Sequence, residues 1–309
     1  MQVSKAVVEE ATTPSSAKRR LGVALKDVRE AAGLSLDEAA RAIQRSAATL
    51  SRLERGRLQK PRMIEVVALL DRYRAVDDSA VTDELSEQIR RLTTQAAEPA
   101  WFKSFRDVLG GPMTADDAQR YIEFESDASA IRTYEPENVP GLLQTPGYAE
   151  AITDVFFPTY SRAERSRFVE LRLARQQVFD RPGDPLQFDV VIGEVALRRR
   201  PTTAKVDVMR EQLLALLGYA EGKQPNVNVR IAPIELGHPA VYGGPYVVMD
   251  LADPDENGLV YLEGRREPQF IQNDDTIDEF RGLHHQLAGA VLDRAGTRAL
   301  LTEAIDGLN

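Results

Sequence analysis

In the N-terminal part of the chain, apolar residues recur three and four positions apart, which is the spacing of amphipathic helices. This pattern predicts a first helix between Ser16 and Gly33, whose inward stripe is Leu21, Leu25 and Val28. A second helix opens at Ser35-Leu-Asp-Glu38, which has the form of a capping box. Small residues would let a neighbouring helix approach closely, and those expected on its inward face are Ala39, Ala40 and Ala42, followed by Ile43.

The stretch Ser46–Arg57 predicts a short third helix. Ser46 is a good N-cap, and Gly56 stands where a helix commonly ends. Leu50 and Leu53 supply an apolar side. The other side is small, polar and basic, and consists of Thr49, Ser51, Arg52, Arg55 and Arg57. A helix of this kind fits the major groove of DNA, and an ordinary solvated basic helix is the alternative.

Two further helices complete the N-terminal pattern. Residues Gln44-Arg45 form the turn between the second and third helices, and a fourth helix follows Pro61 with the stripe Met63, Val66, Val67 and Leu70. A fifth extends from Val81 to Thr94. We therefore expect a disordered tail over residues 1–16, a helix-turn-helix domain over 17–75, a helical connector over 76–100, and a C-terminal domain over 101–309.

The order of these motifs resembles the XRE-class, phage-repressor-like helix-turn-helix domain over about residues 17–75. The matching strings are Gly33-Leu-Ser-Leu-Asp-Glu-Ala-Ala, Ser46-Ala-Ala-Thr-Leu-Ser-Arg-Leu-Glu-Arg-Gly56 and Lys60-Pro-Arg-Met63. The resemblance implies that Ala47, Ala48 and Arg52 face base edges. It also implies contacts near the backbone phosphates from Ser46, Thr49, Ser51, Arg55, Arg57 and Lys60.

Family members often carry long polar residues where this chain has Ala47 and Ala48. Alanine cannot hydrogen-bond a base, although its methyl group can pack on a thymine methyl. Arg52 is therefore the best candidate for direct base readout, with guanine as the expected base. The resemblance gives Glu54 a structural role, in which it pairs with an arginine.

The distribution of charge agrees with a DNA-binding module at one end of the chain. The whole chain has a net charge of −9, yet residues 17–74 contain 14 Lys and Arg against 7 Asp and Glu. The remaining residues are therefore acidic overall, so that only the first module is suited to phosphates. Because the chain has no Cys, no apolar run long enough for a membrane span and no hydrophobic signal core, we expect a cytoplasmic protein without membrane contact.

The C-terminal region first reads as helical. Thr114 caps a helix whose expected apolar side is Ala118, Tyr121, Phe124, Ala128 and Ile131, with Glu123 and Glu125 on a solvated face. An irregular loop with three prolines follows Tyr134. A capping box at Ser161 opens an arginine-rich helix, whose cations either are solvated and paired with acids or bind an anion. The aromatic residues Trp101, Tyr121, Phe124 and Tyr134 either pack in a core or line an apolar cavity.

Farther along, the alternation of apolar and polar residues predicts strands. Strands are expected at 186–192, 226–231, 246–251 and 259–263, helices near 206–217 and 277–291, and a short helix after Gly296. The predicted fold class is therefore multidomain α and α/β: an all-α helix-turn-helix bundle, a helical connector and a C-terminal α/β domain with a small mixed sheet. The segment 252–258 reads as a turn-rich connection.

A second resemblance covers about residues 100–305. The strings Val139-Pro-Gly-Leu-Leu-Gln-Thr145, Arg172-x-x-Arg-Gln176 and Val260-Tyr-Leu-Glu263 resemble the C-terminal domain of WhiJ-like, antitoxin-like regulators of streptomycetes. The resemblance implies a small acidic partner protein or a small-molecule effector. It transfers no ligand-binding residue to this chain.

No arrangement of catalytic residues stands out. The three histidines are His238, His284 and His285, and two adjacent helical histidines point about 100° apart, which does not suit one metal ion. We therefore expect no enzyme activity, no catalytic residue, no metal site and no cofactor. The favoured hypothesis is a dimeric transcriptional repressor on an inverted repeat of double-stranded DNA, controlled through its C-terminal domain. The alternative is an antitoxin-like module that sequesters a small partner protein.

Overall fold

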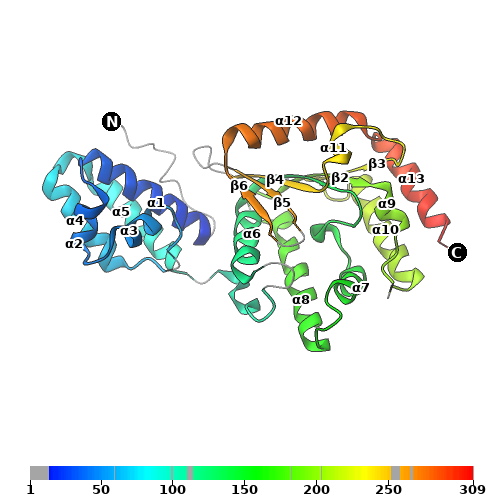
Figure 1. Ribbon diagram of the computed structural model, residues 1–309, viewed down its shortest axis with the longest axis horizontal. Coiled ribbons are helices and arrows are strands. Elements are labelled where there is room, and N and C mark those ends of the chain that lie inside the picture. Colours follow the sequence, from blue (N-terminus) through cyan, green and yellow to red (C-terminus); the bar gives the residue numbers. More distant parts are fainter. Residues whose placement is uncertain are drawn as a thin grey trace. The chain divides into compact units, whose positions relative to one another are not determined.

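The computed structural model describes residues 14–58, 60–98, 100–109, 114–181, 183–202, 204–251, 258–264 and 267–308 (Figure 1). The chain divides into two compact units, the first ending at Lys103 and the second beginning at Ser104. Most of the expected tail lies outside the described residues, and Pro14 already begins the first helix.

The described part of the first unit is entirely helical. Its elements are α1 (Pro14–Ala31), α2 (Leu36–Ala42), α3 (Ala47–Glu54), α4 (Met63–Val76), η2 (Asp78–Ala80) and α5 (Asp83–Ala97). The short helix η3 (Trp101–Phe105) crosses from the first unit into the second. The first-helix stripe is confirmed, since Leu21, Leu25 and Val28 are completely buried. The expectation for Ala42 is wrong: it is exposed at the end of α2, whose buried residues are Ala39 and Ala40.

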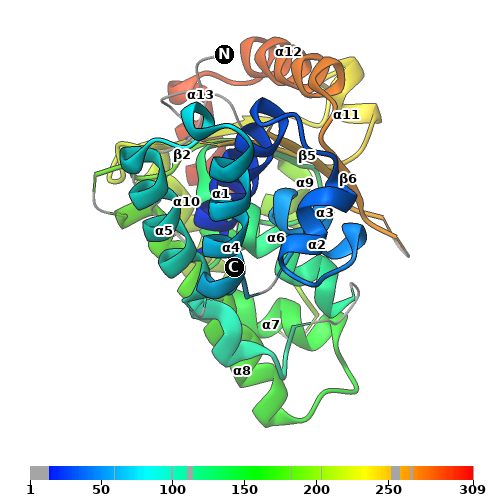
Figure 2. The same ribbon diagram turned by 90° about the vertical axis from the view of Figure 1, so that its left-hand side faces the viewer.

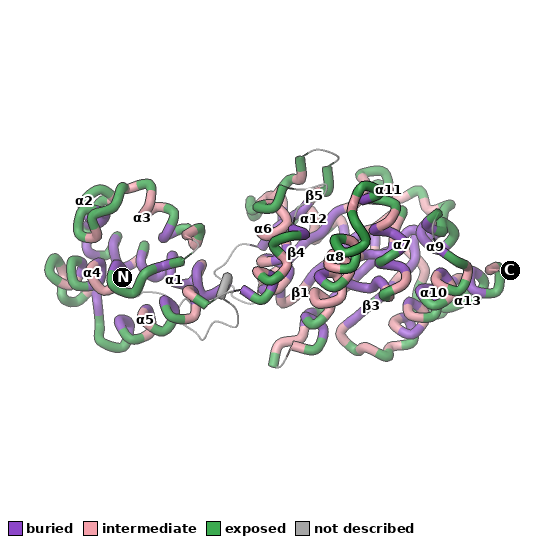
Figure 3. The backbone as a smooth tube through the Cα atoms, turned by 90° about the horizontal axis from the view of Figure 1, so that it is seen from below, coloured by how far each residue is buried: buried purple, intermediate pink, exposed green. Residues whose placement is uncertain are grey.

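The fifth helix is part of the bundle. Val81, Leu85 and Ile89 belong to the same buried cluster as Leu21 of α1, and α5 packs directly along α1. Within this unit α5 lies on the side opposite α2 and α3, and its inner face is buried (Figure 3). The segment expected as a connector therefore contributes to the core that supports the helix-turn-helix.

The second unit combines a sheet with surrounding helices. Its helices are α6 (Ala115–Asp127), η4 (Gly141–Leu143), α7 (Pro146–Phe156), α8 (Arg162–Arg175), η5 (Gln176–Asp180), α9 (Glu194–Arg198), α10 (Val206–Ala220), α11 (Pro239–Tyr242), α12 (Asp274–Ala290) and α13 (Arg294–Asp306). Its strands are β1 (Ala128–Glu135), β2 (Gln187–Gly193), β3 (Val227–Ala232), β4 (Tyr246–Leu251), β5 (Leu259–Leu262) and β6 (Gln269–Ile271).

The six strands form one mixed sheet in the order β3-β2-β1-β4-β5-β6. The pairs β1/β2 and β2/β3 are parallel, while β1/β4, β4/β5 and β5/β6 are antiparallel. In the central register Thr133 of β1 stands between Val190 of β2 and Val247 of β4. The predicted class of an α/β domain with a mixed sheet is thus confirmed.

Helices cover both faces of this sheet (Figure 1). On one face, Ile131, Phe188 and Met249 pack in a large core with residues of α6, α7, η5, α10 and α13. On the other face, Tyr246 and Val260 pack beneath α12 in a smaller core. The division follows the two-residue period of the strands, which sends successive side chains to opposite faces.

A polar cluster lies within the α12 side of the sheet. Asp189 on β2 accepts hydrogen bonds of 2.6 and 2.7 Å from Arg230 on β3, and its carboxylate is 3.5 Å from Nε2 of the buried His284 on α12. Nδ1 of His284 is 3.2 Å from the hydroxyl of Tyr246. Burial would raise the pKa of Asp189, but hydrogen bonds and charge from His284 and Arg230 outweigh it and lower the pKa to about 2.

Two sequence expectations fail at the start of the second unit. The helix expected to include Ile131 ends at Asp127, and the chain passes directly into the central strand β1. The solvated position expected for Glu125 is also wrong, because its side chain is only 1% exposed and pairs with Arg175. The short edge strand β6 was not expected at all, and most of the segment 252–258 lies outside the described residues.

Candidate nucleic-acid interface

The helix-turn-helix is built by local capping at three points. Ser35 and Glu38 form the expected capping box at the start of α2. Gln44, in the turn between α2 and α3, adopts a left-handed φ of 54°, a conformation that non-glycine residues seldom take. Ser46 then caps α3 by accepting a hydrogen bond of 3.3 Å from the backbone N–H of Thr49. This sequence of caps sets where the third helix begins and the direction in which it leaves the turn.

The inner side of α3 is fixed by apolar and close backbone contacts. Leu50 and Leu53 are buried against the rest of the bundle. On α1, Gly22 faces the end of α3 so closely that a Cβ atom there would lie 2.5 Å from the carbonyl oxygen of Glu54. Only glycine therefore permits this approach of α1 to α3, and the closeness of the two helices determines how far α3 stands out from the bundle.

An ion pair buried in the bundle holds the last turn of α3. Arg29 on α1 donates two hydrogen bonds to the carboxylate of Glu54, at 2.7 and 2.9 Å, and a third of 2.8 Å to the carbonyl of Leu34. Hydrogen bonding to Glu54 raises the pKa of Arg29, against the opposing effect of burial. The structural role expected for Glu54 is confirmed, and Arg29 is its partner.

The outer side of α3 is accessible to a ligand. All nine candidate residues expose part of their side chain. Six are exposed, namely Ser46, Ala48, Arg52, Arg55, Arg57 and Lys60, and three are intermediate, namely Ala47, Thr49 and Ser51. In Figure 2, α2 and α3 lie side by side on one side of the first unit. The predicted contacts to bases and phosphates thus remain predictions on a surface that can reach DNA.

The arginines of α3 are held by weak local contacts. Arg52 donates a long hydrogen bond of 3.4 Å to the hydroxyl of Thr49, and Arg55 donates one of 3.1 Å to the carbonyl of Ser51. Among the described residues, no carboxylate pairs with either guanidinium. Arg52 can therefore change its side-chain conformation without breaking an ion pair to a described residue.

Two arginines near α3, Arg45 and Arg62, differ in how strongly they are paired with an acidic residue. Arg45 is committed to Glu65 of α4 through hydrogen bonds of 3.0 and 2.7 Å. Arg62, at the start of α4, leaves 61% of its side chain exposed and contacts Glu65 only at 3.3 Å. Sequence reasoning did not single out Arg62, although its position two residues after Lys60 was a signal for a second basic contact.

Comparison with known families bears on both units. A family model described as a domain of unknown function, DUF5753, matches residues 118–303, which is more than half of the chain. The chain belongs to the DUF5753 family. A second model, described as a helix-turn-helix domain, matches residues 20–85 of this DUF5753 protein. No curated protein and no solved structure matches it.

The helix-turn-helix match and the geometry of α2 and α3 agree on the general function. The first unit of this DUF5753 protein is an XRE-like helix-turn-helix module, and the protein is a DNA-binding regulator in the general sense. In the described part of the chain, no helix has the length and apolar character needed to cross a membrane. Nor do the described residues bring three or more His, Cys, Asp or Glu side chains together in a way that could hold a metal ion.

Proposed function

We propose that the protein is a sequence-specific transcriptional repressor that acts in the cytoplasm. The observation that carries this proposal is the exposed basic side of α3, whose Arg52 has no acidic partner among the described residues. When a helix lies in the major groove of DNA, a guanidinium group without an ion-pair partner can form two hydrogen bonds with one guanine. The neighbouring cations are Arg55, Arg57 and Lys60. They attract the phosphates of any DNA duplex, whatever its sequence.

The protein would act as a dimer on an inverted repeat. One short recognition helix contacts few bases, whereas two copies related by a twofold axis read two half-sites about one helical turn apart. The second unit would supply the dimer contact and receive the controlling signal, a small molecule or a partner protein. The narrower relationship to WhiJ-like, antitoxin-like regulators of streptomycetes is part of this proposal.

The test is fluorescence anisotropy of the full chain on its own upstream DNA and on a scrambled duplex, each at two salt concentrations. A specific regulator is expected to prefer the upstream DNA by roughly 10³-fold or more. A footprint with twofold symmetry would support the dimer. Equal binding to both duplexes, with a steep salt dependence, would contradict sequence-specific regulation. Purification of a tight, stoichiometric small partner together with such weak DNA binding would favour the antitoxin-like alternative.

A further inference from the structure

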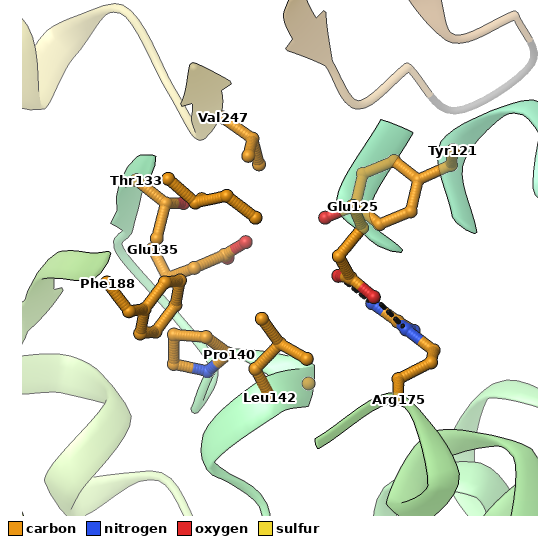
Figure 4. Close-up of a pocket in the computed structure, with 11 residues that line it drawn as sticks. Tyr121, Glu125, Thr133, Glu135, Pro140, Leu142, Arg175, Phe188 and Val247 are labelled. Atoms are coloured by element: carbon orange, nitrogen blue, oxygen red, sulfur yellow. Dashed lines mark hydrogen bonds and ion pairs between the residues drawn. The ribbon is translucent and has the colours of Figure 1, made fainter. Parts of the chain in front are cut away.

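The second unit contains a small cavity at the end of the central strand. The cavity has a volume of about 40 Å³ and lies where β1 ends, between α6, the η4 turn and α8 (Figure 4). One water molecule needs roughly 10–15 Å³ by the same measure, so the space suits the head of a small molecule. Its walls combine apolar side chains such as Leu142 and Phe188 with two carboxyl groups, Glu125 and Glu135, and the guanidinium group of Arg175.

Two of these ionisable groups neutralise each other. Arg175 donates two hydrogen bonds of 2.7 Å each to the two carboxylate oxygens of Glu125. The Glu125 side chain is 1% exposed, and the guanidinium also lies 5.3 Å from the ring centre of Tyr121. Such a planar, bidentate pair has strong geometric preferences and is not readily released. Because Arg175 is bound to Glu125, it does not neutralise the carboxylate of Glu135.

The third group, Glu135, has no such partner. Its carboxylate points into the cavity, across from Glu125 (Figure 4), and none of the described residues forms a hydrogen bond or ion pair with it. Burial, together with the charge of Glu263, raises the pKa of Glu135 to about 8. At neutral pH Glu135 therefore keeps a proton, although it stands in a cavity with room for a cation.

Several titratable or charged groups surround Glu135. They are Tyr121 and Glu125 of α6, Tyr134 of β1, Tyr148 of α7, Arg172 and Arg175 of α8, and Tyr261 and Glu263 at the end of β5. Arg172 does not line the cavity, and its guanidinium donates a hydrogen bond of 2.6 Å to the amide oxygen of Gln144. With Arg175 bound to Glu125, the wall of the cavity keeps one carboxyl group that lacks a countercharge.

The walls select among possible cations. A divalent metal ion prefers several carboxylate or carbonyl oxygens, but of the two carboxylates in the wall Glu125 is already bound to Arg175, which leaves Glu135. The rings of Tyr121 and Phe188 and the aliphatic side chain of Val247 instead suit an alkyl group attached to a charged nitrogen. An ammonium group can also donate several hydrogen bonds to one carboxylate.

We propose that this cavity binds the ammonium group of a small organic amine, with the carboxylate of Glu135 as its counter-ion, and that the amine is the effector of the regulator. The effector role rests on the proposed function, whereas the binding site does not. On binding, the ammonium nitrogen takes the place of the proton that Glu135 carries in the free protein. One proton is then released to solvent for each amine bound below the pKa of Glu135.

The binding site is tested by isothermal titration calorimetry of the full chain with n-propylamine, 1-propanol and propionate. For a ligand of this size we expect a dissociation constant between roughly 50 µM and 5 mM for the amine. The affinity should rise by up to about tenfold per pH unit below pH 8 and then level off. Absence of saturable amine binding at pH 7, 8 and 9, or equal binding of the alcohol or the acid, would overturn the proposal.

Two variants separate charge from shape. Glu135→Gln keeps the size of the side chain but removes its charge, so the amine affinity should fall at least tenfold and lose its pH dependence. This variant should not unfold, because it removes a carboxyl group whose ionised form is destabilised by burial. Glu137→Gln is the matched control, since Glu137 is exposed and pairs with Arg199 at the surface. Loss of amine binding in the control as well would refute the role of Glu135.

The effector role is tested separately by repeating the DNA anisotropy with saturating n-propylamine. The expected result is a change in DNA affinity of twofold or more in the wild-type chain and none in Glu135→Gln. Unchanged DNA affinity at full amine occupancy would overturn the effector role and leave the binding site standing. If specific DNA binding is absent both with and without the amine, the proposed function fails instead, irrespective of the calorimetry.

Discussion

Arg29 on α1 and Glu54 at the end of α3 form a bidentate ion pair that is almost completely removed from solvent, with side chains 8% and 5% exposed. The pair connects α3 to α1, and Arg29 also donates a hydrogen bond to the carbonyl of Leu34 just before α2. One guanidinium thus joins α1 to the end of α3 and to the loop that precedes α2. The orientation of the exposed side of α3 depends on this contact, although both side chains of the pair are buried.

Removal of the acid should destabilise the first unit strongly. Glu54→Ala leaves the buried Arg29 without its countercharge, and we expect the free energy of unfolding to fall by about 3–5 kcal/mol. Chemical denaturation followed by circular dichroism measures the change. Glu30→Ala is the control, because Glu30 also contacts Arg29, at 3.3 Å, but leaves 48% of its side chain exposed. A loss above about 1 kcal/mol in the control would show that exposure does not separate the two acids.

The same substitution should have opposite effects at two glycines. Gly22→Ala places a methyl group 2.5 Å from a backbone oxygen of Glu54, so α1 and α3 must move apart at a cost of about 1–3 kcal/mol. Gly282→Ala lies inside α12 with nothing within 4 Å of the added atom, and should stabilise the second unit by up to about 1 kcal/mol. Differential scanning calorimetry compares both variants with the wild type. Equal shifts in one direction would contradict the close helix contact.

The arginines of the DNA surface should separate into two classes. Arg52→Ala is expected to weaken binding to the cognate site by about 1–3 kcal/mol and to relax specificity at one base pair. Arg57→Ala should weaken all duplexes alike and reduce the salt slope by about 1. Anisotropy on cognate and scrambled DNA measures both effects. The control is Arg91→Ala, an exposed arginine on α5, the side of the unit opposite α3 (Figure 3). An equal loss for Arg52→Ala on both duplexes would remove its assignment to a base.

Acid should weaken the cluster beneath α12 through Asp189. Its folded-state pKa of about 2 lies below the ordinary value of 3.8, so its stabilising effect is complete above about pH 4 and is lost as the pH falls toward 2. Allowing for its partial exposure, we expect wild type to lose about 1–2 kcal/mol more than Asp189→Asn over this window. Thermal unfolding at pH 5, 4, 3 and 2 tests this. Asp278→Asn, at a position 72% exposed, should follow the wild type. Parallel pH profiles for wild type and Asp189→Asn would contradict the shift.

Local sequence signals were sufficient for most of the first unit. Ser35 with Glu38 and Ser46 with Thr49 are caps that form between residues three positions apart, so the sequence displays both partners together. What it could not show was the left-handed backbone of Gln44, because residues other than glycine seldom adopt that conformation. The partner of Glu54 likewise lies 25 residues away in the chain.

The second unit was harder because its decisive contacts are distant in sequence. Ala128 and Ile131 continue the helical spacing of Tyr121 and Phe124, so periodicity alone extended the helix into what is the central strand. Pairing with β2 and β4 overrides that local pattern. Glu125 was assigned to solvent for the same reason, since the arginine that neutralises it is 50 residues farther along. Of the aromatic residues that the sequence offered for an apolar cavity, Tyr121 lines this one. Glu135 was expected in an irregular loop and was not considered as a cavity residue.

The central position of β1 in the sheet affects the order in which the two units can fold during synthesis. The first unit needs only contacts among residues up to Lys103, most of them between neighbouring helices, and such short-range topologies form rapidly. β1 by contrast waits for β4, and the core on one side of it also includes Leu301 near the end of the chain. During synthesis the helix-turn-helix unit can therefore fold long before the second unit is complete. A chain that ends before residue 246 would contain helices α1 to α5 of the first unit but would lack β4 and the rest of the second unit.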